Sequence, residues 1–131
     1  MTKELLKQRT KKFAIMVIRL INDLPNNKAG NAIGNQLIRS GTSIASNYRA
    51  ACRARSSADS ISKITIVEEE CDESLFWLEL IAESGLLSNE LIIKAMAEAY
   101  ELTAIFTAAE KTTKEKISNK RNISKPSSHN H

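Results

Sequence analysis

Residues 4–25 read ELLKQRTKKFAIMVIRLINDLP, and core-type side chains recur in this stretch at alternating steps of four and three residues. This spacing places them on one face of a helix, because an α-helix turns once every ~3.6 residues. The positions on this face are Leu6, Thr10, Phe13, Val17, Leu20 and Leu24. Pro25 cannot continue a helix, since it lacks a backbone N–H. The stretch therefore predicts a core-facing helix from about Glu4 to Leu24, followed by a connection over residues 26–30.

Three further stretches show the same helical spacing. Residues 31–55 predict a second helix, whose middle is rich in small residues such as Gly41 and would let another helix approach closely. Residues 56–84 begin with capping serines and end before Gly85, which is a typical stop signal. Residues 88–116 predict a fourth helix with Ser88 as its cap.

The expected fold is all-α, a single antiparallel up-down-up-down four-helix bundle over residues 1–116. Only four Gly and two Pro occur in 131 residues, so long segments carry no turn signal. Helices joined by short connections pack in this alternating manner. Residues 117–131 are basic and almost without apolar side chains, so we expect them to form a disordered tail.

The expected location is the cytoplasm. No apolar run approaches the roughly 20 residues that a membrane span needs, and the first residues lack the apolar centre of a signal peptide. Cys52 and Cys71 lie in apolar helical stripes without metal-ligand spacing. We interpret them as reduced core residues, with a disulfide as the alternative.

Charge is strongly segregated along the chain, although the net charge is only +4. Residues 1–55 hold 11 basic and 2 acidic side chains, residues 56–110 hold 2 and 12, and residues 111–131 hold 6 and 1. Such blocks form either a basic surface for nucleic acid or complementary helices that attract each other within the fold or between subunits. Charge alone leaves both interpretations open.

Basic side chains of the first two helices and of the tail are the candidate phosphate contacts. Such contacts give salt-sensitive and largely sequence-independent binding, and arginine can also stack on unpaired RNA bases. A solvated helix face is the alternative for each single residue. The predicted nucleic-acid-binding residues are Lys7, Lys11, Lys12, Arg19, Arg39, Arg49, Arg53, Arg55, Lys120 and Arg121.

Glu68 falls at a position of the third helix where the spacing requires an apolar side chain. A buried carboxylate needs hydrogen-bond donors or a counter-charge. Arg39, Ser43 and Asn47 of the second helix are suitable donors, and such a layer would set the register of the helices. We therefore predict a structural polar layer of these four residues, with catalysis by Glu68 as the alternative.

Phe76, Trp77 and Leu78 are consecutive, so they cannot all face one narrow seam of a bundle. A second buried surface is expected, and in a small bundle another subunit readily supplies it. Phe76 and Trp77 are therefore the predicted oligomer interface. A wide core within one chain is the alternative.

The sequence offers little for catalysis. Residues 68–73 form an acidic run, but carboxylate-bridged metal bundles use Glu-x-x-His motifs, and the two histidines, His129 and His131, lie in the predicted tail. No glycine-rich phosphate loop and no nucleophile with a structured histidine base occurs. We predict a non-enzymatic protein without metal or cofactor, and a metal-dependent bundle enzyme is the alternative.

Three segments resemble one known family. They are QLIRSGTSIASN at residues 36–47, RSSAD at residues 55–59 and EECDESLFWLE at residues 69–79. Together they are similar to the bacterial four-helix-bundle family named for 23S rRNA intervening sequences, over roughly residues 5–110. The signature positions, which have no established catalytic task in the family, are Gln36, Arg39, Ser40, Thr42, Ser43 and Asn47.

The resemblance implies small cytoplasmic proteins, often encoded in insertions within large-subunit ribosomal RNA genes. It also implies kinship with accessory proteins of diversity-generating retroelements, a pentameric ring with a basic surface, and nucleic-acid binding. The chain departs from the pattern at Arg49-Ala50-Ala51, where many relatives carry a Glu-Gly pair. Any contact that this acidic residue makes in relatives is therefore in doubt here.

Charge segregation and the resemblance together predict a non-enzymatic homo-oligomer, a pentamer, that binds RNA or DNA through Lys and Arg side chains. The alternative is an oligomeric protein-interaction scaffold, or an accessory subunit of a nucleic-acid enzyme such as a reverse transcriptase.

Overall fold

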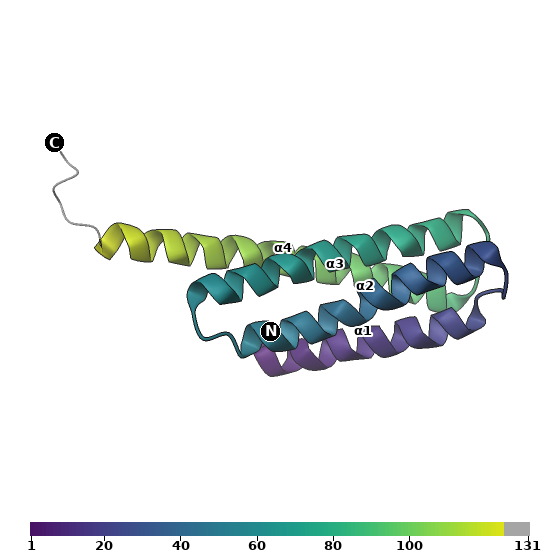
Figure 1. Cartoon of the computed structure of the whole chain (residues 1–131), viewed down its shortest axis with the longest axis horizontal. Helices are drawn as coiled ribbons and strands as arrows, with labels where there is room; N and C mark the ends of the chain where they lie inside the picture. Colours follow the sequence, from purple (N-terminus) through teal and green to yellow (C-terminus); the bar gives the residue numbers. More distant parts are fainter. Residues whose placement is uncertain (125–131) are drawn as a thin grey trace.

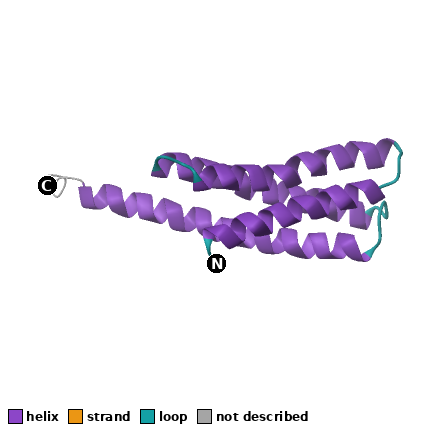
Figure 2. Cartoon of the chain, turned by 90° about the horizontal axis from the view of Figure 1, so that it is seen from below, coloured by secondary structure: helices purple, strands orange, loops and turns teal. Residues whose placement is uncertain are grey.

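Four helices account for most of residues 1–124, the part of the chain that the computed structural model describes. α1 spans Lys3–Asp23, α2 spans Lys28–Cys52, α3 spans Ser57–Glu83 and α4 spans Glu90–Ser124. They pack side by side, and three short connections join them in chain order (Figures 1 and 2). No strand occurs in this part of the chain. The all-α class with four helices is therefore confirmed.

Side chains that accept hydrogen bonds from the first turn mark where α3 and α4 begin. Ser56 Oγ accepts from the backbone N–H of Asp59 at 3.1 Å, which confirms the predicted start of the third helix. At α4, Asn89 Oδ1 accepts from the backbone N–H of Ile92 at 3.1 Å. The predicted cap at Ser88 is therefore wrong by one residue.

The core runs along the shared axis of the four helices. Tyr48 of α2 and Phe106 of α4 meet in it, with ring centroids 5.2 Å apart. Cys71 is fully buried and Cys52 is partly buried, and both are free thiols. The removal of the apolar core side chains from water is the main contribution to the stability of the fold. The largest fully buried side chains include Phe13, Phe106, Leu20, Leu37, Ile44, Leu78, Ile81 and Leu102.

Small residues in the middle of α2 bring its two neighbours close. A Cβ added at Gly41 would lie only 2.9 Å from Cγ2 of Val17 on α1. On the other side, Ser74 Oγ of α3 donates to Ser40 Oγ at 2.9 Å, and both serines are fully buried. The close approach predicted from the small residues is therefore confirmed on both sides of α2.

α4 continues to Ser124, beyond the bundle boundary predicted at residue 116. The predicted disorder is wrong for residues 117–124, which are helical, and residues 125–131 lie outside the described residues. Extending an existing helix costs far less than nucleating a new one, and no helix breaker occurs before Pro126. The last turns of α4 project beyond the other three helices (Figure 1).

Candidate nucleic-acid interface

Arg9 is partly buried, and two carboxylates neutralise its charge where it joins α1 to α4. Its Nε and Nη2 donate to the two carboxylate oxygens of Glu98, each at 2.7 Å, and the guanidinium also pairs with Glu101. The Glu98 hydrogen bonds, followed by the charges of both carboxylates, raise the pKa of Arg9. Arg9 therefore serves the α1/α4 seam, the sparsest of the helix contacts.

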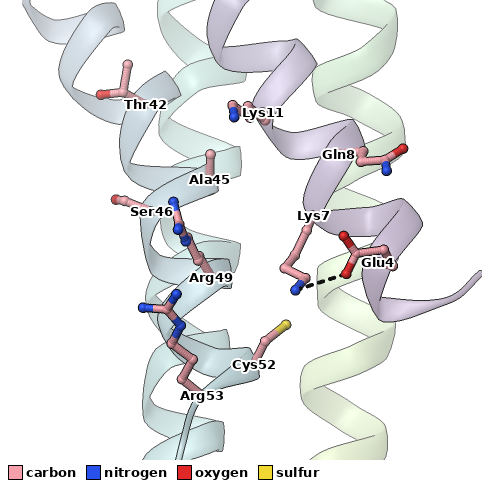
Figure 3. A pocket seen from close by; sticks show the side chains of 10 residues that line it. All are labelled: Glu4, Lys7, Gln8, Lys11, Thr42, Ala45, Ser46, Arg49, Cys52 and Arg53. Carbon is pink, nitrogen blue, oxygen red and sulfur yellow. Dashed lines mark ion pairs between the residues drawn. The ribbon is translucent and has the colours of Figure 1, made fainter.

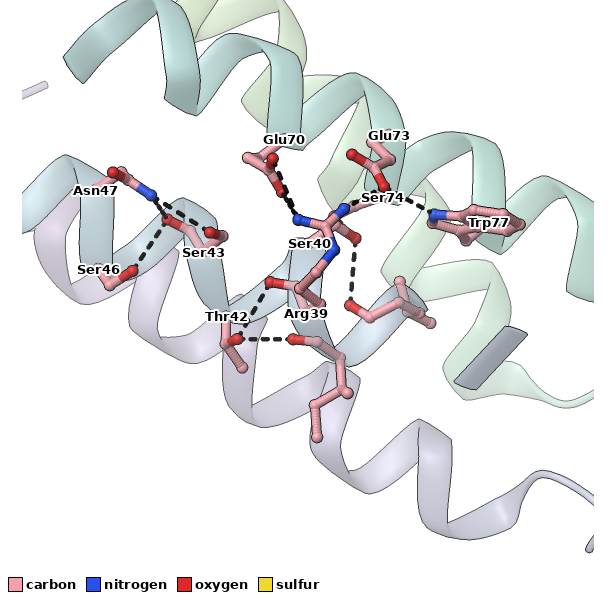
Figure 4. A network of polar contacts seen from close by, with 12 residues as sticks. Arg39, Ser40, Thr42, Ser43, Ser46, Asn47, Glu70, Glu73, Ser74 and Trp77 are labelled. Atoms are coloured by element: carbon pink, nitrogen blue, oxygen red, sulfur yellow. Dashed lines mark hydrogen bonds and ion pairs between the residues drawn. The ribbon is translucent and has the colours of Figure 1, made fainter. Parts of the chain in front are cut away.

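Arg39 is neutralised in a similar way between α2 and α3 (Figure 4). Its Nη1 lies 3.2 Å from Glu70 Oε2, and its Nη2 pairs with Glu73. Glu73 also accepts a hydrogen bond from Trp77 Nε1 at 3.3 Å. The hydrogen bond from Arg39 lowers the pKa of Glu73. The geometry thus places Arg39 in a helix seam, away from the other predicted phosphate contacts.

The predicted polar layer around Glu68 does not form. Asn47 Nδ2 donates to the backbone oxygen of Ser43 at 2.9 Å and to its Oγ at 3.3 Å, so this contact stays within α2 (Figure 4). Arg39 pairs with α3 carboxylates other than Glu68. The prediction is wrong because Val67 and its neighbours on the stripe occupy the centre of the core face of α3, which leaves Glu68 at the flank.

Glu68 instead meets α4, where it forms a cluster with Glu110 and Lys114. Glu110 is only 8% exposed, and its Oε1 lies 2.5 Å from Lys114 Nζ. Hydrogen bonding to Glu110, and then burial, raise the pKa of Glu68 to about 7. The same hydrogen bond, with that from Lys114, lowers the pKa of Glu110. Near neutral pH these neighbours therefore favour the protonated form of Glu68 beside an ionised Glu110.

A groove between the start of α1 and the end of α2 gathers cations that are not neutralised in this way (Figure 3). Its volume is about 620 Å³, and Lys7 and Lys11 line it from α1 while Arg49 and Arg53 line it from α2. In the described part of the chain, Lys11, Arg49 and Arg53 form no ion pair. The one carboxylate among its described lining residues is the exposed Glu4, 3.0 Å from Lys7.

Short side chains form the floor of this groove. Ala45 and Cys52 line it from the side of α2 that faces α1, and Thr42 and Ser46 line it farther out on the same helix (Figure 3). The groove is therefore concave, with its positive charge on both walls. The thiol of Cys52, which is partly buried, belongs to this lining.

A second, more open hollow of about 740 Å³ lies at the same end of the bundle, and Cys52 lines both. The α2–α3 connection, the first turn of α3 and the end of α4 form it, together with Lys3 of α1. Arg55, Lys120 and Arg121 add further positive charge, and no carboxylate occurs among its described lining residues. We call this surface the end hollow. The helical end of α4 is what brings Lys120 and Arg121 to it.

Seven of the ten predicted nucleic-acid-binding residues thus line the groove or the end hollow. Lys12 and Arg19 do not; they are exposed on α1, two turns apart. Lys3, a further basic candidate of the first helix, lines the end hollow and shares a helix face with Lys7 and Lys11, which follow it at steps of four. The prediction missed the short side chains of the floor, because nothing in their residue types distinguishes a groove from a helix contact.

The predicted oligomer residues differ in their surroundings. Phe76 is 51% exposed, whereas Trp77 is partly buried against the core. The ring centroids of Phe76 and Trp77 lie 5.1 Å apart. Ile93 and Tyr100 of α4 are also largely exposed. These apolar side chains lie at the surface of the single chain, and their role between subunits stays a prediction.

Neither a metal site nor a membrane span occurs in the part of the chain that the structure describes. No group of three or more His, Cys, Asp or Glu side chains is arranged to hold a metal ion there. No helix of these residues combines the length and the hydropathy needed to cross a bilayer.

The chain is similar to known proteins over most of its length. Residues 3–109 match the family model described as 23S rRNA-intervening sequence protein. A crystal structure of a protein with unknown function, from the S23 ribosomal protein family of Bacteroides thetaiotaomicron VPI-5482, is 30% identical with a TM-score of 0.76. That likeness covers 85% of this chain and 99% of the other. No curated protein matches the chain significantly. The chain belongs to the 23S rRNA-intervening sequence protein family.

Proposed function

We propose that this chain is a non-enzymatic, cytoplasmic protein that binds RNA or DNA through the cations of the groove and the end hollow. The groove is the observation that carries the proposal, because two helices direct four cationic side chains into it and only one exposed carboxylate opposes them. Cations this close repel one another, and a polyanion relieves that repulsion. A nucleic-acid backbone supplies regularly spaced phosphates for such a surface.

Titration of fluorescently labelled structured RNA, followed by anisotropy at low and moderate salt, tests the proposal. We expect micromolar or tighter binding at about 50 mM salt and much weaker binding at about 200 mM, because phosphate contacts release counterions. Absence of binding at micromolar protein in low salt would reject it.

Paired substitutions separate the groove from net charge. Arg49→Gln with Arg53→Gln removes two charges from the groove, and Lys12→Gln with Arg19→Gln removes the same charge from the exposed face of α1. We expect the groove variant to bind at least ~10-fold more weakly and its salt slope to fall by about 1.4, at ~0.7 per lost single-strand contact. The control should stay within about twofold of the unmodified protein; equal losses would show that only net charge matters.

We further propose that the subunit is an antiparallel up-down-up-down bundle in a ring-shaped homo-oligomer, a pentamer. The short connections between consecutive helices support the topology (Figure 1). The exposed apolar side chains of Phe76, Ile93 and Tyr100 support assembly, since such surface is usually covered in soluble proteins.

A second candidate function is a protein-interaction scaffold or an accessory subunit of a nucleic-acid enzyme such as a reverse transcriptase. The observation that favours it is the exposed acidic surface of α3, where Glu69, Asp72 and Glu83 flank the apolar Phe76. This function predicts an oligomer that does not bind RNA in low salt. The titration described above therefore separates the two candidates.

A further inference from the structure

The cationic side chains of the groove form two rows, one along each wall. Lys7 and Lys11 are one turn apart on α1, where such a step rises ~6 Å along the helix. Arg49 lies in the last turn of α2, and Arg53 caps that helix four residues later, so it continues the row past the end of α2. The step from Lys7 to Lys11 is comparable with the separation of successive phosphates in an extended strand. Lys3 extends the α1 row by another turn into the end hollow.

The spacing of packed helices is too small for a double helix to enter between α1 and α2. Neighbouring helices of a bundle lie about 8–10 Å apart, whereas the major groove of a DNA duplex alone is ~12 Å wide. A duplex would touch the tips of the exposed arginines and would not reach Ala45 or Cys52. A single strand is narrow enough to lie between the two rows.

We propose that the groove binds a single-stranded nucleic acid, RNA or DNA, whose phosphates lie between the Lys7–Lys11 row and the Arg49–Arg53 row. The proposal rests on the proposed function and names the form of nucleic acid that the site takes. The described lining residues include no aromatic side chain, so bases stack on guanidinium groups or point to solvent. Binding is therefore largely independent of sequence.

Cys52 provides a reporter inside the groove. The chain has two cysteines, and Cys71 is fully buried while Cys52 is accessible in the groove lining. Alkylation by N-ethylmaleimide under native conditions therefore labels Cys52. A strand that fills the groove covers this thiol, whereas a duplex held at the rim leaves it open.

The test compares a labelled single strand of about 12 nucleotides with the duplex of the same sequence, as RNA and as DNA, at low salt. We expect the single strands to bind at least ~10-fold more tightly than the duplexes and to slow alkylation of Cys52 at least ~5-fold. Equal binding of both forms, or strand binding that leaves the alkylation rate unchanged, would overturn the proposal while leaving the proposed function in place. Failure of every nucleic acid to bind would instead reject the proposed function and, with it, this proposal.

Two charge insertions on α2 give a matched pair of variants. Ser46→Glu places a carboxylate in the groove, and Asn35→Glu places one on the exposed surface of the same helix outside it. We expect Ser46→Glu to weaken single-strand binding at least ~10-fold and Asn35→Glu to change it less than ~2-fold, with circular dichroism confirming the fold of both. Equal effects would count against the groove. If Ser46→Glu fails to fold, the Cys52 protection measurement still decides.

Discussion

The raised pKa of Glu68 beside Glu110 makes the stability of the bundle depend on pH. The folded chain raises the pKa of Glu68 from 4.5 to about 7, so between these values it holds a proton that the unfolded chain releases. The stabilising contribution of Glu68 is therefore present at acidic pH and lost as the pH rises through 7. The lowered pKa of Glu110 acts in the opposite direction, and its contribution is lost as the pH falls below the usual carboxylate range.

Glu68→Gln should remove most of the loss of folding stability at high pH. The glutamine amide can donate a hydrogen bond to Glu110 without adding a second negative charge. We expect the variant to be more stable by about 1 kcal/mol at pH 8. This free energy is well below the one that corresponds to the full pKa shift, because Glu68 is partly exposed and solvent screens the interaction. The gain should shrink towards pH 5. Thermal unfolding at both pH values measures it, with Glu69→Gln, on the exposed face, as the control. An equal gain at both pH values would contradict the raised pKa of Glu68.

Arg39 should matter for stability and not for nucleic-acid binding. Arg39→Gln leaves Glu70 and Glu73 without their counter-charge, so we expect the melting temperature to fall by a few degrees. RNA affinity should stay within about twofold, whereas Arg49→Gln, with the same loss of charge, should weaken binding without lowering the melting temperature. The opposite pattern would place Arg39 among the phosphate contacts.

Residue types alone could predict most of the cations of the site but not which of them are neutralised. Arg9 finds Glu98 and Glu101 about ninety positions later in the chain, and that pairing exists only once α1 packs against α4. The predicted contact of Glu68 with the second helix is wrong for the same reason. The spacing of residues predicts which face of a helix a side chain lies on, but not which other helix packs beside that face.

At the scale of the helices, the closest packing is that of α1 on α2 at Gly41. A Cβ at this position would lie 2.9 Å from the fully buried Val17, so Gly41→Ala should lower stability by about 1 kcal/mol despite the better helix propensity of alanine. Gly34→Ala is the matched control, since its Cβ would meet the end of the Leu24 side chain at 3.3 Å and Ile21 Cγ2 at an ordinary contact distance of 3.7 Å. We expect this control to be neutral or stabilising by up to ~1 kcal/mol, as measured by urea unfolding. A stabilising Gly41→Ala would show that the two helices can move apart freely.

The end of α4 should contribute to binding and little to stability. Removal of residues 117–131 takes Ile117, Lys120 and Arg121 from the end hollow but leaves the buried core intact. We expect weaker RNA binding and a lower salt slope, with helicity reduced only by the residues removed. Lys120→Gln with Arg121→Gln should reproduce the binding loss without shortening the helix. Collapse of the far-ultraviolet dichroism on truncation would show that the end of α4 is part of the core.

Helix periodicity predicted the existence and number of the helices, while their ends depended on features that periodicity does not contain. α2 begins at Lys28, earlier than expected, because Asn27 Oδ1 accepts from the backbone N–H of Gly30 at 2.8 Å. α4 ends later than expected, since a helix already formed extends through polar residues that would not start one. Composition therefore underestimates helices at their polar ends.

At the scale of the whole molecule, the separation of charge along the chain has two structural consequences. Acidic side chains of α3 and α4 neutralise Arg39 and Arg9, so part of the charge of α1 and α2 stabilises the fold. Four other cations, Lys7, Lys11, Arg49 and Arg53, lie where α1 and α2 meet each other and line the groove. The charge pattern therefore holds helices together through some residues and gathers positive charge in a groove through others.

The proposed assembly belongs to the same scale, because apolar side chains are exposed on all four helices. In a ring each subunit joins its neighbours through two different surfaces, so exposed Phe76 on α3 must meet another surface of the next copy. Phe76→Ser should therefore convert a pentamer into smaller species in multi-angle light scattering, with helicity unchanged. Ile18→Ser tests the α1 side, where Ile18 is 43% exposed. Dissociation by Ile18→Ser alone would move the interface to α1, and a monomeric unmodified protein would exclude the ring.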